Sequence, residues 1–306
     1  MGNHKYPENS FAEVNGVNLH YLEWSGTGVY LLLLAGYSNS AYIFKSFATW
    51  FTDHFRVVAL TRRGHGQSEI TEAGYDLDTR VEDIRGFLDH LRAESVILVG
   101  HSMGGDELTC FVRRYPDRVR ALVYLDAALE RSAKVQSENP LRDLYSNKEP
   151  EEAWDSVEDY LEYCRREYPT MTKRWDVWRD ELLQEVDIEP DGKVRDRLTP
   201  EIAEKFRDVM KDFKPEYSAI RCPVISFYAM QDSHPRLPKD ASRELVEAAN
   251  AYWRNIVNGW IRENADRLQR AVKHSVVVEI QDAGHYLFLD KEEEVAEQTK
   301  RFLLRV

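Results

Sequence analysis

The 306-residue sequence predicts an α/β fold: a mostly parallel sheet with helices on both faces. Two observations carry this prediction. Continuous apolar runs of strand length alternate along the chain with segments of helical periodicity. The runs themselves are typical of strands that are covered on both faces. They occupy residues 29–34, 55–60, 95–99, 119–125, 223–228 and 275–280.

The remaining elements are consistent with this architecture. Residues 11–14 and 17–24 alternate apolar and polar side chains around Asn15-Gly16, which predicts an antiparallel β-hairpin at the start of the sheet. Since crossovers between parallel strands are right-handed, the loops that follow the strands should meet at one edge, where a ligand is expected. Helices are predicted over residues 41–51, 77–91, 106–115, 239–272 and 292–304.

One of these loops has the pattern of a nucleophile site. The strand that ends at Val99 runs into Gly100-His101-Ser102-Met103-Gly104, and a helix follows. Glycines two residues before and after a serine allow a strained turn to pack tightly between strand and helix. The context of strand, turn and helix makes Ser102 the predicted nucleophile.

A serine hydroxyl needs a base, and that base is usually a histidine oriented by a carboxylate. His285 follows the last strand, so we expect it to be the base. Asp232 follows the preceding strand and is the favoured acid, which gives the chain order Ser102, Asp232, His285. Asp126 also ends a strand at this edge and is the alternative acid.

A tetrahedral intermediate needs preset N–H donors. The residue after the nucleophile, Met103, is expected to supply one backbone N–H. The second is expected from Tyr37, in the loop after the strand at 29–34. His65 and His101 are interpreted as scaffold residues near the site.

The pattern changes in the middle of the chain, where residues 131–218 are polar and helical without a convincing strand. The sequence therefore predicts an α/β core over residues 1–130 and 219–306, with a helical cap inserted at 131–218. Acidic residues in the cap offer a site for a substrate amine, although such a run is more often the solvated face of a helix. They are Glu149, Glu151, Glu152, Asp155, Glu158, Asp159 and Glu162.

Composition narrows the function classes. A net charge of −12 argues against nucleic acid and anionic membranes as partners. The three cysteines lack metal-site spacing, and neither a secretory signal nor a membrane span is recognisable. We therefore expect a cytoplasmic protein with a small-molecule substrate, no metal and no cofactor, and a possible homodimer.

Together, five features resemble the α/β-hydrolase superfamily over nearly the whole chain outside the cap. They are the hairpin, Gly100–Gly105, the loop Arg63-Gly64-His65-Gly66-Gln67-Ser68, the strand-end Asp232 and Gly284-His285. The resemblance implies an eight-stranded sheet and hydrolysis through an acyl-serine. Two positions differ from the usual pattern: Ala35-Gly36 replaces His-Gly in the oxyanion loop, and Thr61 replaces an aspartate. Ser102 excludes the branches that carry an aspartate nucleophile.

These expectations lead to a serine hydrolase of small carboxylic esters, with the carboxylesterase type as first hypothesis. Amidase or aminopeptidase, lactonase and cofactor-free perhydrolase activities use the same residues and stay open as alternatives. A hypothesis of another class is a ligand-binding receptor on a hydrolase fold. The complete set Ser102, Asp232 and His285 argues for an enzyme.

Overall fold

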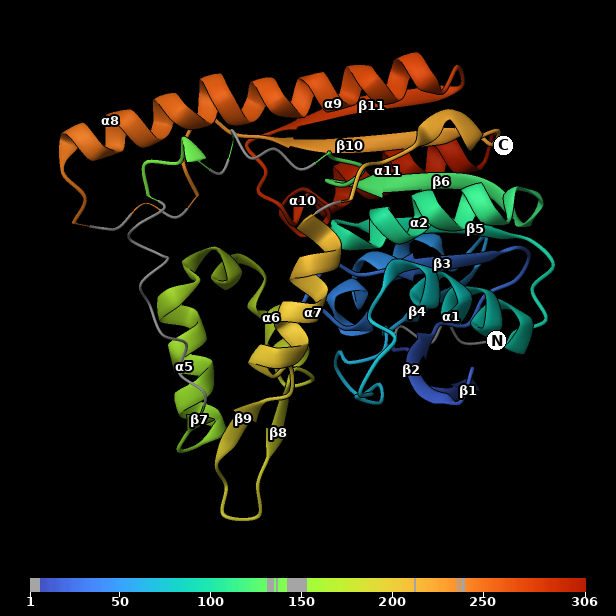
Figure 1. Ribbon diagram of the computed structural model, residues 1–306, viewed down its shortest axis with the longest axis horizontal. Coiled ribbons are helices and arrows are strands. Elements are labelled where there is room, and N and C mark those ends of the chain that lie inside the picture. Colours follow the sequence, from blue (N-terminus) through green and yellow to red (C-terminus); the bar gives the residue numbers. More distant parts are fainter. Residues whose placement is uncertain are drawn as a thin grey trace.

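The computed structural model in Figure 1 describes residues 6–130, 135, 137–141, 153–211, 213–235, 237 and 240–306. Its centre is an eight-stranded sheet in the order β1-β2-β4-β3-β5-β6-β10-β11. The hairpin of β1 and β2 is antiparallel, β2 pairs antiparallel with β4, and all later pairings are parallel. The predicted fold class is confirmed. The strands are β1 (Glu8–Val14), β2 (Val17–Glu23), β3 (Tyr30–Leu34), β4 (Arg56–Leu60), β5 (Val96–His101), β6 (Val119–Leu125), β10 (Val224–Met230) and β11 (Ser275–Gln281).

Helices bury their apolar sides on both faces of the sheet. On one face, α1 (Leu77–His90), α2 (Met103–Arg114) and α9 (Asn258–Ala271) form a core around Phe87, Phe111 and Leu268. On the other, the main cover is η1 (Ala41–Phe44), η2 (Phe47–Phe51), α10 (Leu287–Asp290) and α11 (Glu292–Leu303), where Phe44, Phe47 and Phe288 pack together. This double cover explains the continuous apolar strands. Short 3₁₀ turns, η3 (Pro116–Arg118) and η5 (Tyr217–Ala219), precede β6 and β10.

Between β6 and β10, residues 153–211 form a separate layer beside the carboxyl ends of the parallel strands (Figure 1). Its helices are α5 (Val157–Glu167), η4 (Pro169–Arg174), α6 (Trp175–Leu182) and α7 (Pro200–Lys211). We call residues 153–211 the cap. The expected start of the cap at Arg131 lies outside the described residues.

The expectation of a cap without strands is wrong. Three short antiparallel strands, β7 (Ala153–Trp154), β8 (Val186–Ile188) and β9 (Val194–Asp196), pair in the order β7-β9-β8. Strands of two or three residues are too short for alternation to be recognised in the sequence. The turn residues Pro190-Asp191-Gly192 lie in the loop of the hairpin between β8 and β9.

Two predicted helices also differ in detail. Residues 41–51 form the two 3₁₀ turns η1 and η2 instead of one α-helix. The long helix at the top of Figure 1 consists of α8 (Arg243–Tyr252), a π-turn at Trp253–Val257 and α9. Among the described residues, no helix combines the length and apolar character that crossing a lipid bilayer requires.

Candidate active site

Ser102 occupies a strained turn between β5 and α2. Its backbone has φ 51° and ψ −118°, outside the usual regions for an L-residue. A Cβ on Gly100 would lie 2.2 Å from Leu108 Cδ1, and one on Gly104 would lie 2.3 Å from Leu34 O. The turn therefore depends on both glycines, as the sequence pattern indicates.

His285 is paired with Asp126. His285 Nδ1 lies 2.7 Å from Asp126 Oδ2, whereas Asp232 is exposed. Only the Asp232 backbone oxygen has a recorded hydrogen bond among the described residues, and it accepts from Arg254. The expectation that Asp232 orients His285 is corrected: the alternative, Asp126, occupies that place.

The local backbone explains why Asp126 reaches His285. Asp126 follows β6 with a φ of 45°, which turns the chain sharply at the strand end. Its Oδ1 accepts the Ala229 N–H at 2.9 Å, so the end of β10 holds the carboxylate. Asp126 is 7% exposed and has one oxygen left for His285. The carboxylate is thus fixed before any ligand arrives.

The loop that carries His285 is also held in place. The Gly284 N–H donates to Asp290 Oδ2 at 2.7 Å, and His101 Nε2 donates to the His285 carbonyl at 2.9 Å. Because a carbonyl only accepts, His101 carries its proton on Nε2. Burial lowers the pKa of His101 well below its usual value, which keeps this ring neutral.

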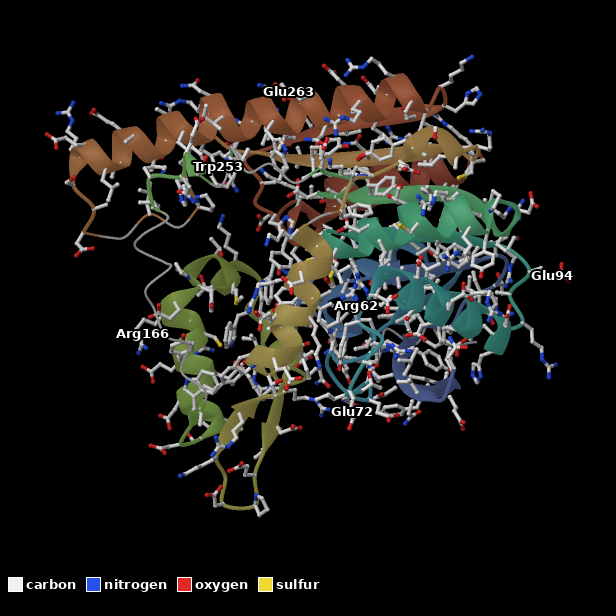
Figure 2. All side chains as sticks on the ribbon, in the orientation of Figure 1. Arg62, Glu72, Glu94, Arg166, Trp253 and Glu263 are labelled. Atoms are coloured by element: carbon white, nitrogen blue, oxygen red, sulfur yellow. The ribbon has the colours of Figure 1, made fainter. Side chains whose placement is uncertain are left out.

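A cavity between the cap and the strand ends is lined by Ser102, Asp126 and His285. Its far wall is apolar, and Figure 2 marks Trp253 beneath the long helix, on the side of the cap. The residues of this wall are Leu129, Val135, Trp253, Val257, Trp260 and Ile261. Among the described residues, no group of three or more His, Cys, Asp or Glu side chains is arranged to hold a metal ion.

Tyr37 lies in a loop that is held close to Ser102. A Cβ on Gly36 would lie 3.2 Å from Ser102 Cβ, which shows how closely this loop approaches the turn. The Ser38 N–H donates to His65 Nε2 at 3.0 Å and is already engaged. Burial lowers the pKa of His65, so its ring is neutral and Nε2 can accept. Both expected scaffold histidines thus bond to backbone atoms.

Arg62 braces the loop at Ala35-Gly36, where this sequence differs from the usual His-Gly pattern. Its guanidinium donates to the carbonyls of Ala35 and Gly36, the latter at 2.6 Å. The same guanidinium is paired with Glu107 of α2. One arginine therefore ties the loop that contains Tyr37 to the helix that follows Ser102.

Glu107 is fully buried between two arginines. It accepts from Arg62 Nε at 2.9 Å and from Arg80 Nη1 at 2.8 Å. Burial alone would raise the Glu107 pKa, but the two guanidinium groups outweigh it and lower the pKa. The three side chains form one buried ionic network beneath the site.

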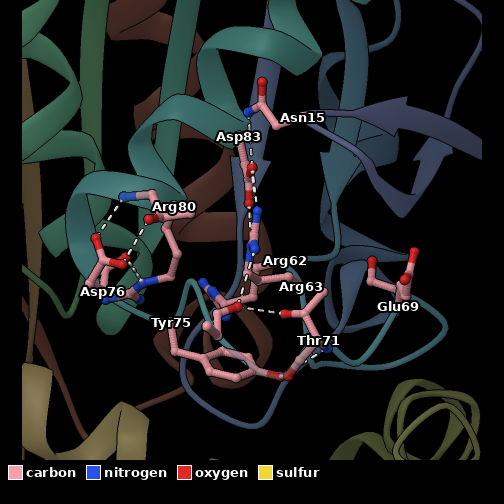
Figure 3. A network of polar contacts seen from close by, with 12 residues as sticks. Asn15, Arg62, Arg63, Glu69, Thr71, Tyr75, Asp76, Arg80 and Asp83 are labelled. Carbon is pink, nitrogen blue, oxygen red and sulfur yellow. Dashed lines mark hydrogen bonds and ion pairs between the residues drawn. The ribbon is translucent and has the colours of Figure 1, made fainter.

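A second ion pair fixes the loop that carries His65. Figure 3 shows Arg63 against Asp83 of α1, at Nε–Oδ2 2.7 Å and Nη2–Oδ1 2.8 Å. Asn15 of the first hairpin donates to the same Asp83. This bidentate pair holds the start of the glycine-rich loop on α1.

Sequence reasoning missed Arg62, Glu107 and Glu181. Glu181 is a buried cap residue that accepts hydrogen bonds from Asn39 and Ser40. A signal was present for both glutamates, because each lies three or four positions from apolar residues on the buried side of its helix. Arg62 has no such signal, since it lies in a loop.

The acidic stretch of the cap is not at the cavity. Its described members, Asp155, Glu158, Asp159 and Glu162, are exposed and do not line the cavity. Glu149, Glu151 and Glu152 lie outside the described residues. The solvated-face interpretation accounts for the four described residues.

Comparison with known proteins identifies the family. Residues 31–298 match the model of the alpha/beta hydrolase family. The chain belongs to that family. The crystal structure of an E-2-(acetamidomethylene)succinate hydrolase superposes on this chain with a TM-score of 0.75 and 20% identity, covering 97% of this chain and 99% of the other. A marine microorganism esterase gives a TM-score of 0.68 at 20% identity, covering 93% and 98% of the two chains.

Curated sequences match this chain over shorter stretches. A 2-(acetamidomethylene)succinate hydrolase of Mesorhizobium japonicum is 32% identical, over 37% of this chain and 41% of that protein. A bifunctional esterase/perhydrolase of Acinetobacter calcoaceticus is 31% identical, over 48% and 52%. A non-heme chloroperoxidase of Kitasatospora aureofaciens is 32% identical, over 54% and 55%. The matches thus span about half or less of these relatives.

Proposed function

We propose that this protein is a serine hydrolase that cleaves small carboxylic esters through an acyl-serine intermediate. The proposal rests on one arrangement: Ser102 on a strained turn and the hydrogen-bonded pair His285–Asp126 line one cavity. The relative named as an esterase/perhydrolase supports the choice of esters.

In the proposed first half-reaction, Ser102 Oγ attacks the acyl carbon while His285 Nε2 accepts its proton. Nδ1 of the same ring is engaged with Asp126, so Nε2 is the nitrogen left for this task. Asp126 stabilises the imidazolium that forms and fixes its tautomer. His285 then gives the proton to the leaving alcohol.

The negative charge on the carbonyl oxygen is held by backbone N–H groups. Met103 is the first residue of α2, where N–H groups point out of the helix unpaired. Tyr37 supplies the second donor, since the neighbouring Ser38 N–H is already used by His65. In the second half-reaction, water attacks the acyl carbon, with His285 as base, and Ser102 is released.

The apolar wall around Trp253 and Trp260 would receive the hydrocarbon part of the ester. A second candidate activity, perhydrolysis, follows if hydrogen peroxide replaces water in the second half-reaction. The relative named as an esterase/perhydrolase supports perhydrolysis as this second candidate.

The test is pre-steady-state mixing with an activated ester, followed by kcat/KM for matched ester, anilide and lactone substrates, with and without hydrogen peroxide. We expect a burst of alcohol product of about one equivalent per protein chain. Among the matched substrates, we expect the ester to give the highest kcat/KM. A preference for the anilide or the lactone would replace the ester assignment. Stabilisation by these compounds without turnover would instead favour a receptor.

A further inference from the structure

Glu181 is a carboxyl group of the cap that is buried against the loop carrying Tyr37. It lies on α6 and has 0% exposure. Its Oε1 accepts the Ser40 N–H at 2.6 Å and the Asn39 Nδ2–H at 3.2 Å, and its Oε2 accepts the Ser40 hydroxyl at 2.6 Å. These three donors belong to residues 39–40, and the backbone of Ile43 also contacts the carboxyl, so one cap side chain holds this end of the loop.

The loop is therefore held at both ends, with Tyr37 between. Arg62 fixes the carbonyls of Ala35 and Gly36 on the side of β3. On the other side, Glu181 fixes Asn39 and Ser40. The core provides the first anchor, whereas the second comes from the inserted segment. The orientation of the Tyr37 N–H thus depends on where the cap lies.

The same contacts extend to the loop of His285. Tyr286, the next residue, donates its hydroxyl to Asn39 Oδ1 at 3.0 Å. Tyr286 also packs edge-on against Trp178 of α6, with ring centroids 4.6 Å apart. Asn39 therefore joins Glu181 to Tyr286, and α6 contacts both catalytic loops of the proposed mechanism.

We propose that Glu181 is a positioning residue: the cap uses it to align the Tyr37 N–H with the developing oxyanion on substrate bound at Ser102. This inference rests on the proposed function. It assigns the cap a part in transition-state stabilisation in addition to covering the cavity. Donors to an oxyanion contribute only when they are aligned in advance, so a loop released from Glu181 should slow acylation more than it weakens substrate binding.

The test compares Glu181→Ala, Glu181→Gln and Asp180→Ala. Asp180 is a matched control, because it is the neighbouring acid on α6 and ties the cap to Lys45 without a recorded bond to residues 35–40. Gln keeps an acceptor for Asn39 and the Ser40 N–H, and its amide can donate to the Ser40 hydroxyl. If Glu181→Ala does not fold, the double variant Asn39→Ala/Ser40→Ala removes both side-chain bonds to Glu181 and the link to Tyr286 while leaving the cap carboxyl in place, and it should show the same loss of burst rate.

For Glu181→Ala we expect a burst rate about 10- to 100-fold lower, with KM changed by less than about threefold. Glu181→Gln and Asp180→Ala should stay within about threefold of the parent rate. Affinity for a trifluoromethyl ketone, whose hemiketal oxygen occupies the oxyanion site, should fall with the burst rate. Affinity for the product carboxylate should not.

Equal losses in Glu181→Ala and Asp180→Ala would mean that only cap docking matters and would overturn the inference. So would an unchanged burst rate in Glu181→Ala, or equal losses of affinity for both inhibitors. If the parent protein itself gives no burst and no covalent adduct, the proposed function fails instead, so the two failures are distinguishable.

Discussion

Asp126 Oδ2 lies 2.7 Å from His285 Nδ1, across 159 positions of sequence. The pair joins the end of β6 to the loop after β11, although β10 lies between these strands in the sheet. Asp126 reaches over the end of β10 and is anchored there by the Ala229 N–H. The carboxylate is therefore held by two partners, one on each oxygen.

Because His285 pairs with Asp126, we expect substitution of Asp126 to lower kcat much more than substitution of Asp232. Asp126→Asn should lower kcat by about 10⁴-fold, because the amide leaves His285 without its carboxylate partner. Asp232→Asn should change kcat by less than about twofold, since Asp232 is exposed and has no recorded side-chain bond to His285 among the described residues. Steady-state measurement of kcat for both variants on one ester would show which aspartate is the acid. The reverse order of losses would restore Asp232 as the acid.

We expect opposite effects on stability from substituting Gly104, in the turn at Ser102, and Gly259, a control glycine in α9. Gly104→Ala should lower the free energy of unfolding by about 2–4 kcal/mol, because its Cβ would lie 2.3 Å from Leu34 O. Gly259→Ala, in α9, should raise it by about 1 kcal/mol, since nothing lies within 4 Å and alanine favours the helix. Urea unfolding of both variants measures this. Equal stability would show that the turn tolerates a side chain.

The buried network predicts a large stability loss on removing its acid. Glu107→Gln removes the charged partner that both buried arginines, Arg62 and Arg80, bond to, which should cost about 3 kcal/mol or more. The exposed pair Arg243–Glu247 is the matched control, and Glu247→Gln should cost less than about 0.5 kcal/mol. Urea unfolding midpoints compare the two. Similar midpoints would mean that the buried charges are compensated by other contacts.

Glu181 predicts a pH dependence of stability with a defined sign. Burial raises the pKa of Glu181 to about 7, against an ordinary 4.5, while the nearby Glu185 carboxyl also has a raised pKa because of burial and the charge of Glu181. Between these pH values the folded state binds more protons than the unfolded state. The protonated Glu181 therefore contributes to the free energy of unfolding in full below pH 4.5. This contribution is lost as the pH rises towards 7, by at most about 1.4 kcal/mol per pH unit.

Thermal unfolding of the parent protein and Glu181→Gln from pH 5 to 8 measures this contribution together with the effect of Glu181 on Glu185. The buried histidines have the opposite pH dependence, but they are common to both proteins. We expect the stability of Glu181→Gln relative to the parent to increase with pH. A pH-independent difference would show that Glu181 ionises with an ordinary pKa.

The sequence was most informative where local pattern and fold agree. The apolar run before Gly100 and the glycines around Ser102 identified both the strand and the strained turn, because close packing there tolerates few alternatives. His285 was found for a similar reason, since it follows the last strand. The choice between Asp126 and Asp232 depends on the order of β6, β10 and β11 and on the φ of 45° at Asp126. Neither is visible in local sequence.

Long-range contacts account for the other omissions. Arg62 acts through backbone carbonyls of another loop, which leave no trace in side-chain patterns. In the sequence, Glu181 differs from its surroundings only as a charged residue on an apolar helix face. Its hydrogen-bond partners are more than 140 positions away. The cap strands and the π-turn at Trp253–Val257 are too short for periodicity to indicate them.

The central claim, an acyl-serine at Ser102, is tested most directly by treating the protein with a fluorophosphonate and measuring intact mass, then mapping the modified peptide. We predict one adduct per chain, on Ser102, with loss of esterase activity in proportion to labelling and no adduct on Ser102→Ala. An adduct on another residue, or full labelling and turnover in Ser102→Ala, would contradict the account.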